Sequence, residues 1–313
     1  MAKQVKVVVP GSCNVDLMVF TPLIPRGGET VLGTEFQMSI GGKGTNQATA
    51  ARRAGAAVSM ITRIGDDALG AFAGAHYRQE GIDPTFVTVT PHTATGTATI
   101  LVDETSGQNR IIVASGANVC ITPDDVLAAQ AEIAGADAVI LQNEVNPQVS
   151  LAAARLAKSC GCRCILNPAP AVELPAELIA CADYITPNET EAEFYTGIVI
   201  QTPDDAIRAG RALLKLGAAC AVLTLGDKGA AIIRPGLERL IPAPHVHPVD
   251  TTGAGDCFNG VLAVALSEGL DEVRAVHRAC MAASFAIQRK GAAVSCPTRS
   301  EIDTMCAAHP LEA

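Results

Sequence analysis

The sequence predicts an α/β protein with a doubly wound, mostly parallel sheet, helices on both faces and a small additional β-sheet. Apolar residues make up 49% of the 313 residues but aromatic residues only 3%, so Ala, Val, Ile and Leu must form the core. Such a core suits parallel strands that are buried on both faces. Short apolar strands alternate with helical segments along most of the chain. We therefore expect one α/β domain spanning residues 1–313.

The main sheet is expected to consist of short apolar strands and one hairpin. In chain order the strands are Val5–Val9, Ala57–Ile64, Ala138–Gln142, Arg163–Asn167, Tyr184–Pro187, Ala219–Leu225 and the hairpin Ala230–Arg234 with Arg239–Ile241. The intervening helices are predicted from their apolar periodicity, from acidic residues near their N-termini and from glycines at their C-termini. In chain order they are Thr45–Gly55, Asp67–Gly81, Pro147–Gly161, Pro203–Gly217, Gly255–Gly269 and Asp271–Arg289.

Two stretches interrupt this order because they alternate polar and apolar residues. They are Glu29–Ile40 and Thr95–Ser115, and a turn at Glu104–Gly107 splits the second. Hairpins inserted near the N-terminal strands of an α/β sheet would form a small second sheet. We expect this sheet, built from about 14–40 and 95–115, to act as a lid over a site at the strand ends. Surface decoration is the alternative.

The predicted lid carries apolar residues that an isolated sheet would leave exposed. Examples are Val31, Phe36 and Ile40. Pairing two lids would bury that face, so the sequence predicts a homodimer through the lid.

The net charge and the cysteine content indicate which classes of partner the protein binds and in which cellular compartment it lies. Lys plus Arg number 23 against 32 for Asp plus Glu, a net charge of −9, which disfavours nucleic-acid and anionic-membrane partners. The apolar runs are shorter than the roughly 18 residues of a membrane span, and the N-terminal stretch lacks the features of a signal peptide. The eleven cysteines, an odd number lying mostly in apolar runs, indicate reduced thiols. The sequence therefore predicts a cytoplasmic protein.

The segment Val249–Gly260 is the most informative for chemistry. Glycines at 253 and 255 open an apolar helix, whose free N–H groups and dipole would form an anion site for phosphate. Asp256 lies in the first turn beside this site. It could instead serve only as a first-turn acid that stabilises the helix.

A second glycine-rich loop, Gly41–Gln47, also precedes a helix. It is not a Walker A loop because Gly44 follows Lys43 where Ser or Thr is required, and no dinucleotide fingerprint follows the first strand. Its glycines would let a ligand approach the main chain closely, and its cationic and amide side chains could bind hydroxyl groups or phosphate. A helix cap with a solvated lysine is the alternative.

Polar side chains follow several of the predicted strands. Asn14 and Asp16 could bind adjacent sugar hydroxyls, and Glu144 occupies an analogous position. The segment Pro187–Glu191 offers carboxylates and an amide for Mg²⁺ or its waters. Each group could also be a helix cap, but their recurrence at successive strand ends favours a ligand site.

Taken together, four motifs of the sequence resemble those of a known protein family. Gly41–Asn46, Asn188–Glu191, Thr224–Gly229 and Asp250–Asp256 occur in the order seen in the ribokinase-type (phosphofructokinase B) carbohydrate kinases. The resemblance spans roughly Val5 to Ser295. Asn14 with Asp16, the 41–46 loop and Glu144 are similar to the ribose-phosphorylating members. The resemblance implies transfer of phosphate from ATP to the 5-hydroxyl of D-ribose.

The resemblance also implies roles for individual residues. Asp256 would be the general base, and Gly253, Ala254 and Gly255 would form the anion hole. The implied sugar ligands are Asn14, Asp16, Gly42, Lys43, Asn46, Glu144 and Asp256. The implied ATP contacts are Asn188, Thr224, Leu225, Gly226, Asp227, Lys228, Gly229, Gly255 and Cys280.

Two cations are implied by the same resemblance. Mg²⁺ would accompany ATP near Glu191, through water. A monovalent cation, K⁺, would lie beside the anion hole, held largely by main-chain oxygens. Its implied ligands are Asp250, Thr252, Ala286, Arg289, Gly291 and Ser295. Many family members carry Asn or His at the position of Cys280, so nucleotide selectivity can differ here.

Two alternatives remain open at the level of the sequence. One is a kinase for another substrate, such as 2-deoxyribose, fructose or a nucleoside. The other is a sugar-binding regulator without catalysis. Asn14 favours a sugar with both vicinal hydroxyls, and retention of Asp256 and the two anion-hole glycines argues against the regulator.

Overall fold

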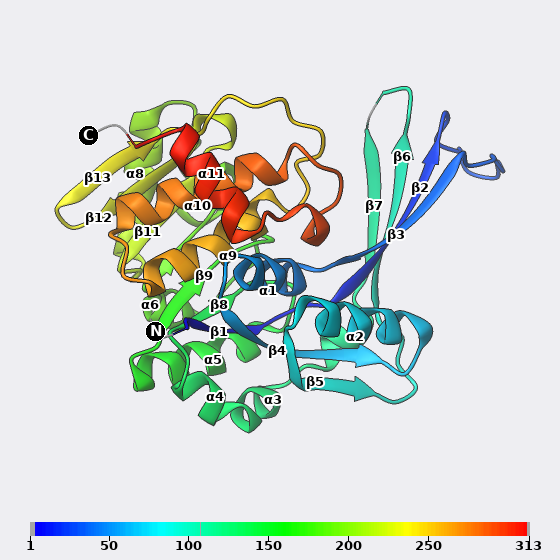
Figure 1. Ribbon diagram of the computed structural model, residues 1–313, viewed down its shortest axis with the longest axis horizontal. Coiled ribbons are helices and arrows are strands. Elements are labelled where there is room, and N and C mark those ends of the chain that lie inside the picture. Colours follow the sequence, from blue (N-terminus) through cyan, green and yellow to red (C-terminus); the bar gives the residue numbers. More distant parts are fainter. Residues whose placement is uncertain (1–3, 107, 312–313) are drawn as a thin grey trace.

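A nine-stranded sheet forms the centre of the molecule. The computed structural model describes residues 4–106 and 108–311. The strand order is β13-β12-β11-β10-β9-β8-β1-β4-β5, and only β12 and β13 run antiparallel to their neighbours (Figure 1). The strands are β1 (Lys6–Pro10), β4 (Ala57–Gly65), β5 (Asp83–Thr90), β8 (Ala138–Leu141), β9 (Arg163–Leu166), β10 (Tyr184–Ile185), β11 (Cys220–Thr224), β12 (Ala230–Arg234) and β13 (Leu237–Ile241). The predicted doubly wound sheet is confirmed.

Helices cover both faces of this sheet. One face carries α1 (Lys43–Arg53), α2 (Ala68–Glu80), α9 (Ala254–Ser267), α10 (Glu272–Ala286) and α11 (Arg299–Ala308). The other carries α3 (Pro123–Ala128), α4 (Gln130–Ala134), α5 (Pro147–Cys160), α6 (Ala176–Cys181), α7 (Glu189–Thr196) and α8 (Pro203–Lys215). Neighbouring residues of β1 point into different cores, with Val7 and Val9 in the first and Val8 in the second. Alternating burial of this kind explains why the strands are apolar throughout.

The strand order reverses between β1 and β8. The chain proceeds from β1 to β4 and β5 on one side, and from β8 to β9, β10 and β11 on the other. The carboxyl ends of strands at such a switch point bound a natural ligand crevice. Residues 11–14 and 142–144 leave the sheet at this point.

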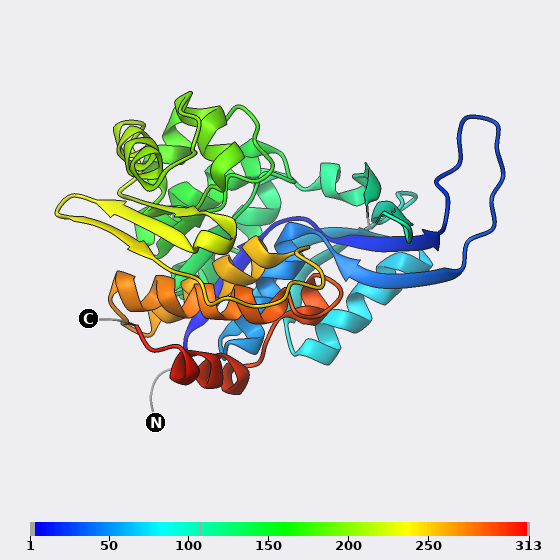
Figure 2. The same ribbon diagram turned by 90° about the horizontal axis from the view of Figure 1, so that it is seen from above.

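A separate four-stranded sheet projects from the carboxyl ends of the main strands. It has the order β3-β2-β6-β7, with β2 (Asn14–Thr21) parallel to β6 (Gly96–Asp103), and β3 (Glu35–Gly41) and β7 (Asn109–Ala114) at its edges. Figure 1 shows it standing beside the main body, and Figure 2 shows the loop between β2 and β3 extending beyond it. The predicted second sheet is confirmed.

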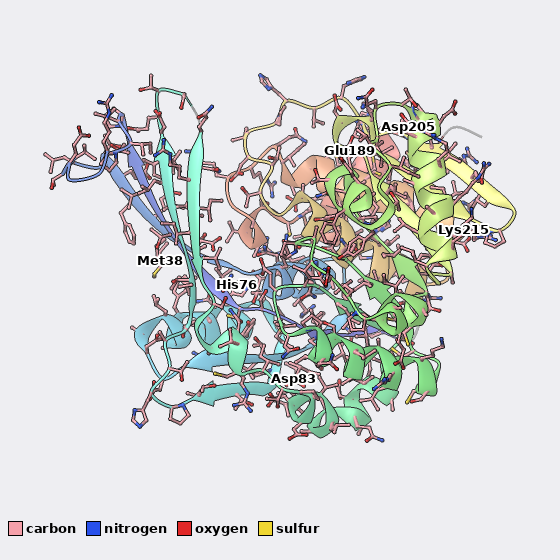
Figure 3. All side chains as sticks on the ribbon, turned by 180° about the vertical axis from the view of Figure 1, so that it is seen from behind. Met38, His76, Asp83, Glu189, Asp205 and Lys215 are labelled. Carbon is pink, nitrogen blue, oxygen red and sulfur yellow. The ribbon has the colours of Figure 1, made fainter. Side chains whose placement is uncertain are left out.

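The second sheet exposes fewer of the expected apolar residues than the sequence suggested. Phe36 is 63% exposed and Met38 41%, and Figure 3 places Met38 on the side of the molecule away from Glu189. Ile40, in contrast, is buried, because β3 rejoins the main body there. Val31 lies in the loop before β3 and is partly buried. The expectation that Ile40 is exposed was therefore wrong.

Most predicted elements lie within one or two residues of the observed ones, and several were missed. The strand β5 lies at a sheet edge and is half exposed, so it lacks an apolar signature. The helix α11 follows a capping box at Thr298 and was not among the predicted helices. All eleven cysteines are free thiols. No helix in the described part of the chain is long and apolar enough to cross a membrane.

Candidate active site

The glycine-rich loop between β3 and α1 is packed against the segment that follows β1. Gly42 has a φ of 85°, and a Cβ there would lie 2.8 Å from the main-chain nitrogen of Asn14. A Cβ at Gly44 would lie 2.6 Å from the main-chain nitrogen of Ser12. Only glycine permits this approach. The close packing brings the first turn of α1 next to the switch point of the sheet.

Asp256 is buried where α1 meets α9. Its Oδ2 accepts a hydrogen bond from Asn46 Nδ2 at 2.8 Å, and its Oδ1 accepts one from Gln47 Nε2 at 2.9 Å. Burial raises the pKa of this carboxyl, whereas the Lys43 ammonium lowers it. Within the described part of the chain, these two hydrogen bonds link the Asp256 side chain to α1, and none links it to the main chain of its own helix, Ala254–Ser267. Asp256 is therefore held by α1 rather than serving as a cap.

Lys43 and Glu144 hold opposite charges at the start of α1. Glu144 Oε2 accepts hydrogen bonds from Ser12 Oγ at 2.5 Å and from the main-chain N–H of Lys43 at 2.9 Å. The pKa of Lys43 is raised, chiefly by Asp256. The lysine lies among Asp256, Glu144 and Glu191, so it is not the solvated side chain of the alternative interpretation. Its ammonium is poised to neutralise negative charge at this position.

Asn14 and Asp16 lie on the same face of β2. Asn14 is 4% exposed and its Oδ1 accepts a hydrogen bond from Asn118 Nδ2 at 2.8 Å. Asp16 packs over Gly41, where a Cβ would lie 2.4 Å from both of its carboxylate oxygens. Burial, with smaller contributions from the carboxylates of Glu144 and Asp256, raises the pKa of Asp16 to about 6. The pair presents an amide and a carboxyl group side by side.

A cavity of about 210 Å³ opens beside Asp256 at the N-terminus of α9. Gly253, which has a φ of 76°, turns the chain into the helix so that the first-turn N–H groups face this space. A Cβ at Gly253 would meet Ala292 at 2.8 Å, so the turn is also closely packed. The lining residues are Lys43, Asn167, Ala169, Thr186, Asn188, Glu191, Thr224, Thr251, Gly253, Ala254, Gly255, Asp256 and Asn259. The predicted anion-hole residues, Lys43 and Asp256 therefore share one cavity.

A larger cavity of about 610 Å³ adjoins the first, and both are lined by Asn188, Thr224, Thr251, Ala254 and Gly255. Seven of the nine predicted ATP-contacting residues line it: Asn188, Thr224, Gly226, Asp227, Gly229, Gly255 and Cys280. Leu225 and Lys228 do not, and Leu225 is buried beneath the loop. A nucleotide-sized space thus leads into the smaller cavity beside Asp256.

Sequence reasoning missed the loop that forms one wall of the larger cavity. Ala243, Pro244, His245, Val246 and Pro248 line it, between β13 and α9. The segment has neither helical nor strand periodicity, and its prolines mark it only as a loop. Its position across the cavity could not be read from the sequence.

Asn188 and Glu191 form the cap that the sequence left as an alternative. Asn188 Oδ1 accepts from the Glu191 N–H at 2.8 Å, and Glu191 Oε2 accepts from the Asn188 N–H at 2.9 Å. This capping box begins α7. Burial raises the pKa of Glu191. Both side chains still line the smaller cavity, so capping fixes their position there.

Asp250 joins the two segments that, by the family resemblance, would hold a monovalent cation. Its Oδ1 accepts from the Thr252 N–H and its Oδ2 from the Gly291 N–H, both at 2.9 Å. The main-chain oxygen of Ala286 accepts from the Arg289 N–H at 3.0 Å. Among the residues described, no group of three or more His, Cys, Asp or Glu side chains could hold a metal ion.

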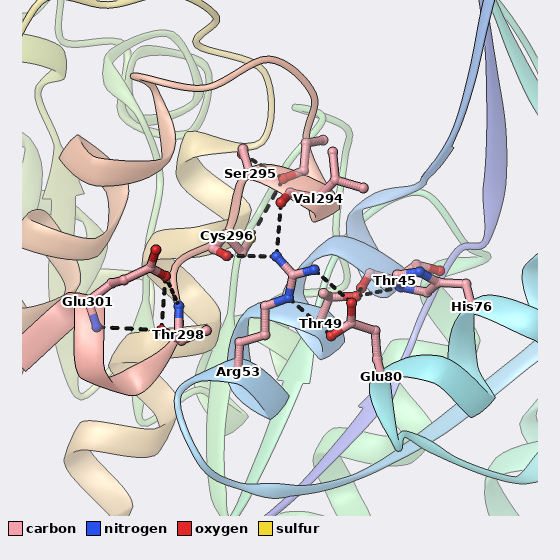
Figure 4. A network of polar contacts seen from close by, with 11 residues as sticks. Thr45, Thr49, Arg53, His76, Glu80, Val294, Ser295, Cys296, Thr298 and Glu301 are labelled. Carbon is pink, nitrogen blue, oxygen red and sulfur yellow. Dashed lines mark hydrogen bonds and ion pairs between the residues drawn. The ribbon is translucent and has the colours of Figure 1, made fainter.

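Arg53 anchors the second of these segments to α1. Its Nη1 donates to the carbonyls of Val294 and Cys296, at 2.9 and 2.8 Å, on either side of Ser295 (Figure 4). Its Nε and Nη2 donate to Glu80, at 3.0 and 2.7 Å. The predicted cation segment is therefore tied to the helix that carries Lys43.

A chain of buried hydrogen bonds that sequence reasoning did not find supports the site. Gln47 Nε2 also donates to Asn167 Oδ1 at 3.1 Å, and Asn167 Nδ2 donates to the Thr186 carbonyl at 3.0 Å. Thr186 Oγ1 donates to Asn259 Oδ1 at 2.6 Å, and Asn259 Nδ2 donates to the Gly255 carbonyl at 2.8 Å. Asn167 and Thr186 follow β9 and β10, so the strand-end argument could have found them.

Comparisons with known proteins agree with this geometry. A family model described as pfkB family carbohydrate kinase matches residues 4–299. The chain is 40% identical to a ribokinase of Haemophilus influenzae over 293 residues, which cover 94% of this chain and 95% of that protein. It is 36% identical to a deoxyribokinase of Salmonella typhi, with 93% and 95% covered. The structure of Arabidopsis thaliana ribokinase complexed with ribose and ATP matches with a TM-score of 0.89 and 31% identity, covering 97% of this chain and 99% of that one.

Proposed function

Because the chain belongs to the pfkB family of carbohydrate kinases, we propose that it transfers the γ-phosphoryl group of ATP to the 5-hydroxyl of D-ribose, giving ribose 5-phosphate and ADP. One observation carries the proposal: the buried Asp256 lies beside the N-terminus of α9, in a cavity that joins a nucleotide-sized one. A carboxylate and a set of N–H donors are then available at the same place. They are the two groups that transfer to a hydroxyl requires.

Asp256 acts as the general base in this proposal. It takes the proton of the 5-hydroxyl as the hydroxyl oxygen attacks the γ-phosphorus and the bond to the bridging oxygen of ADP breaks. Asn46 and Gln47 orient the carboxylate with one hydrogen bond to each oxygen. Lys43 and the N–H groups at Gly253, Ala254 and Gly255 stabilise the charge that builds up on the transferring phosphoryl group.

The sugar is held by groups that follow β1 and β8. Asn14 and Asp16 bind two of its hydroxyls, Gly42 and Asn46 approach it from the glycine loop, and Glu144 contributes its Oε1. Glu144 Oε2 already accepts from Ser12 and Lys43, so the other oxygen is the one available. We further propose that the second sheet, as a lid over this site, excludes water.

ATP occupies the larger cavity, and Mg²⁺ enters with its phosphates. Asn188, Thr224, Gly226, Asp227, Gly229, Gly255 and Cys280 line that cavity, and Glu191 faces the phosphate-proximal one. With Glu191 Oε2 in the capping box, Oε1 is the oxygen that would accept from Mg²⁺-bound water. Leu225 and Lys228 line neither cavity, and their role in the proposal is to support the loop.

A monovalent cation fits between the two segments joined by Asp250. The implied ligands are Asp250 and Thr252 with Ala286, Arg289, Gly291 and Ser295. The carbonyls on either side of Ser295 are occupied by Arg53, whereas no hydrogen bond to the Ser295 carbonyl is found within the described residues. When bound, K⁺ would supply positive charge that fixes the loop before α9.

The proposed function is tested by ADP release with Mg-ATP and D-ribose, beside 2-deoxyribose, fructose and a nucleoside panel. We expect D-ribose to give the highest kcat/KM, with greater turnover in K⁺ than in Na⁺. A rise in unfolding temperature in K⁺ over Na⁺, measured without substrates, would test cation binding separately. Turnover only with another substrate would overturn the sugar assignment, and sugar binding without turnover would indicate the non-catalytic regulator.

We also propose a cytoplasmic homodimer. Eleven free thiols fit a reducing compartment. The lid exposes Phe36 and Met38 on one edge strand and Ile111, Ile112 and Val113 on the other, each at least 41% exposed. Two lids paired through these residues would cover both edges. Sedimentation at micromolar concentration should give twice the monomer mass, and a monomer would contradict the proposal.

Asp16→Asn is expected to weaken sugar binding while stabilising the fold at neutral pH. The folded-state pKa of Asp16 is about 6, above the ordinary value of 3.8, so the folded protein binds this proton more tightly than the unfolded chain. Its ionisation therefore destabilises the fold as pH rises from about 4 to above 6. The asparagine removes that penalty, on the order of 3 kcal/mol at pH 7.

Urea unfolding at pH 7 and at pH 4 checks the stability effect, which should be large at pH 7 and small at pH 4. Ribose KM in the wild type should rise as pH falls below about 6, because protonation removes the acceptor charge. An unchanged KM in Asp16→Asn would contradict its place in the sugar site.

A further inference from the structure

The orientation of the Asn14 side-chain amide is fixed by Asn118, on the short 3-10 helix Gly116–Cys120 that follows β7. The main-chain N–H of Cys13 lies 2.8 Å from Asn118 Oδ1. A main-chain N–H can only donate, so the Asn118 atom that it meets is the carbonyl oxygen. The other terminal atom of Asn118 is then its NH₂ group. It donates to the Cys13 carbonyl at 3.1 Å and to Asn14 Oδ1 at 2.8 Å.

The same hydrogen bonds leave the NH₂ group of Asn14 available. Within the described residues, Asn14 Nδ2 has no hydrogen-bond partner. It is not one of the unpaired polar atoms that are buried, so it is open to a ligand. Asn14 and Asp16 are two apart on β2 and face the same side of the sheet. Asn14 therefore offers a donor beside the carboxyl group of Asp16.

Asn14 cannot turn its amide over without disturbing its surroundings. Gly96 lies opposite Asn14 on β6, and a Cβ there would lie 2.3 Å from both Asn14 Oδ1 and Asn118 Nδ2. Asn118 is 2% exposed, so its hydrogen bond to Asn14 is shielded from solvent. Reversing the amide would place two NH₂ groups against each other in a buried position.

We propose that Asn118 is a positioning residue that determines sugar specificity through Asn14. By holding the carbonyl of Asn14, it presents the NH₂ group as a donor to an oxygen of the vicinal hydroxyls of ribose. A deoxy sugar that lacks this hydroxyl leaves the donor unpaired, and a site built around a hydroxyl rejects such an analogue. The inference rests on the proposed function and extends it to a residue that does not touch the sugar.

Asn118→Asp tests the proposal with the smallest change of shape. The new carboxylate still accepts from the Cys13 N–H but can donate neither to the Cys13 carbonyl nor to Asn14, so Asn14 turns its NH₂ group toward it and its carbonyl toward the sugar. We expect the preference for D-ribose over 2-deoxyribose or 3-deoxyribose, as the ratio of kcat/KM values, to fall at least tenfold. Calorimetric Kd values for the three sugars should change in the same sense. Asn118→Ala provides a second variant, which leaves the Asn14 amide free to rotate and should lower the ratio less.

The background Asn14→Ala distinguishes positioning from a structural role. In it, either Asn118 substitution should leave the sugar ratio unchanged, because the group that it orients is absent. Asn143→Ala is the matched control: this buried amide donates to the Pro170 carbonyl, outside the predicted sugar ligands, and should leave the ratio unchanged. Equal losses with all three sugars in both Asn118 variants would overturn the proposal. If the wild type neither binds nor phosphorylates ribose, the proposed function fails and this inference fails with it.

Discussion

Asp256→Asn is expected to lower kcat for ribose phosphorylation by about 10²–10⁴-fold, the range that a positioned general base contributes. The asparagine cannot accept the proton of the 5-hydroxyl. It also places an NH₂ group where Asn46 and Gln47 both donate, so one of these hydrogen bonds is lost. Steady-state kinetics at saturating Mg-ATP and ribose measures the effect.

The comparison with Asp16→Asn makes this prediction specific. Both substitutions convert a carboxyl group with a raised pKa into an amide in the same site. Loss of the base should appear in kcat, whereas loss of a sugar ligand should appear in KM. Circular dichroism and thermal unfolding verify that both variants fold. A kcat within tenfold of the wild type in Asp256→Asn would remove Asp256 from the role of base.

The pH dependence of kcat provides a second measurement on the same group. Burial raises the pKa of Asp256 above the ordinary value of an aspartate, with Lys43 opposing the shift. The base works only when it is ionised, so kcat should fall toward acid pH, beginning at a higher pH than a free carboxyl would cause. Lys43→Met removes the opposing charge and should move this acid limb to still higher pH.

Strand ends are where the sequence was most informative. Asn14, Asp16 and Glu144 were predicted as ligands because they follow apolar strands, and the structure places all of them around the switch point between β1 and β8. The rule is geometric: parallel strands bring their carboxyl ends to one edge wherever they occur in the chain. It applies equally to Asn167 and Thr186, which were not recognised.

Contacts between segments far apart in the sequence could not be predicted in the same way. Gln47 and Asp256 are separated by 209 residues, and Cys13 and Asn118 by 105. Nothing in local periodicity specifies which residues of two amphipathic helices meet, because that depends on the crossing angle and on the small residues at the crossing. The contacts that support Asp256 and Asn14 therefore emerged only from the structure.

Gly260→Ala should destabilise the fold, because it acts where α1 and α9 cross. A Cβ at 260 would lie 2.6 Å from the Gln47 carbonyl oxygen and 2.6 Å from Ala50 Cβ. Both are rigid parts of α1, so the helices must separate. We expect a loss of about 1–3 kcal/mol in the free energy of unfolding, the usual cost of overpacking a core.

The same substitution should also lower kcat, which a change confined to stability would not. Moving α1 away from α9 lengthens the hydrogen bonds that Asn46 and Gln47 make to Asp256, and a displacement near 1 Å can cost about 10²-fold in rate.

Gly74→Ala is the matched control within α2, since the nearest atom to its Cβ would be Nη1 of the flexible Arg78 side chain, at 3.5 Å. There the better helix propensity of alanine should stabilise the protein by about 0.5–1 kcal/mol and leave kcat unchanged. Urea unfolding and steady-state kinetics on both variants test these two predictions. Equal stability and equal kcat in the two variants would contradict them, and would mean that α9 can shift at Gly260 without moving Asp256 away from α1.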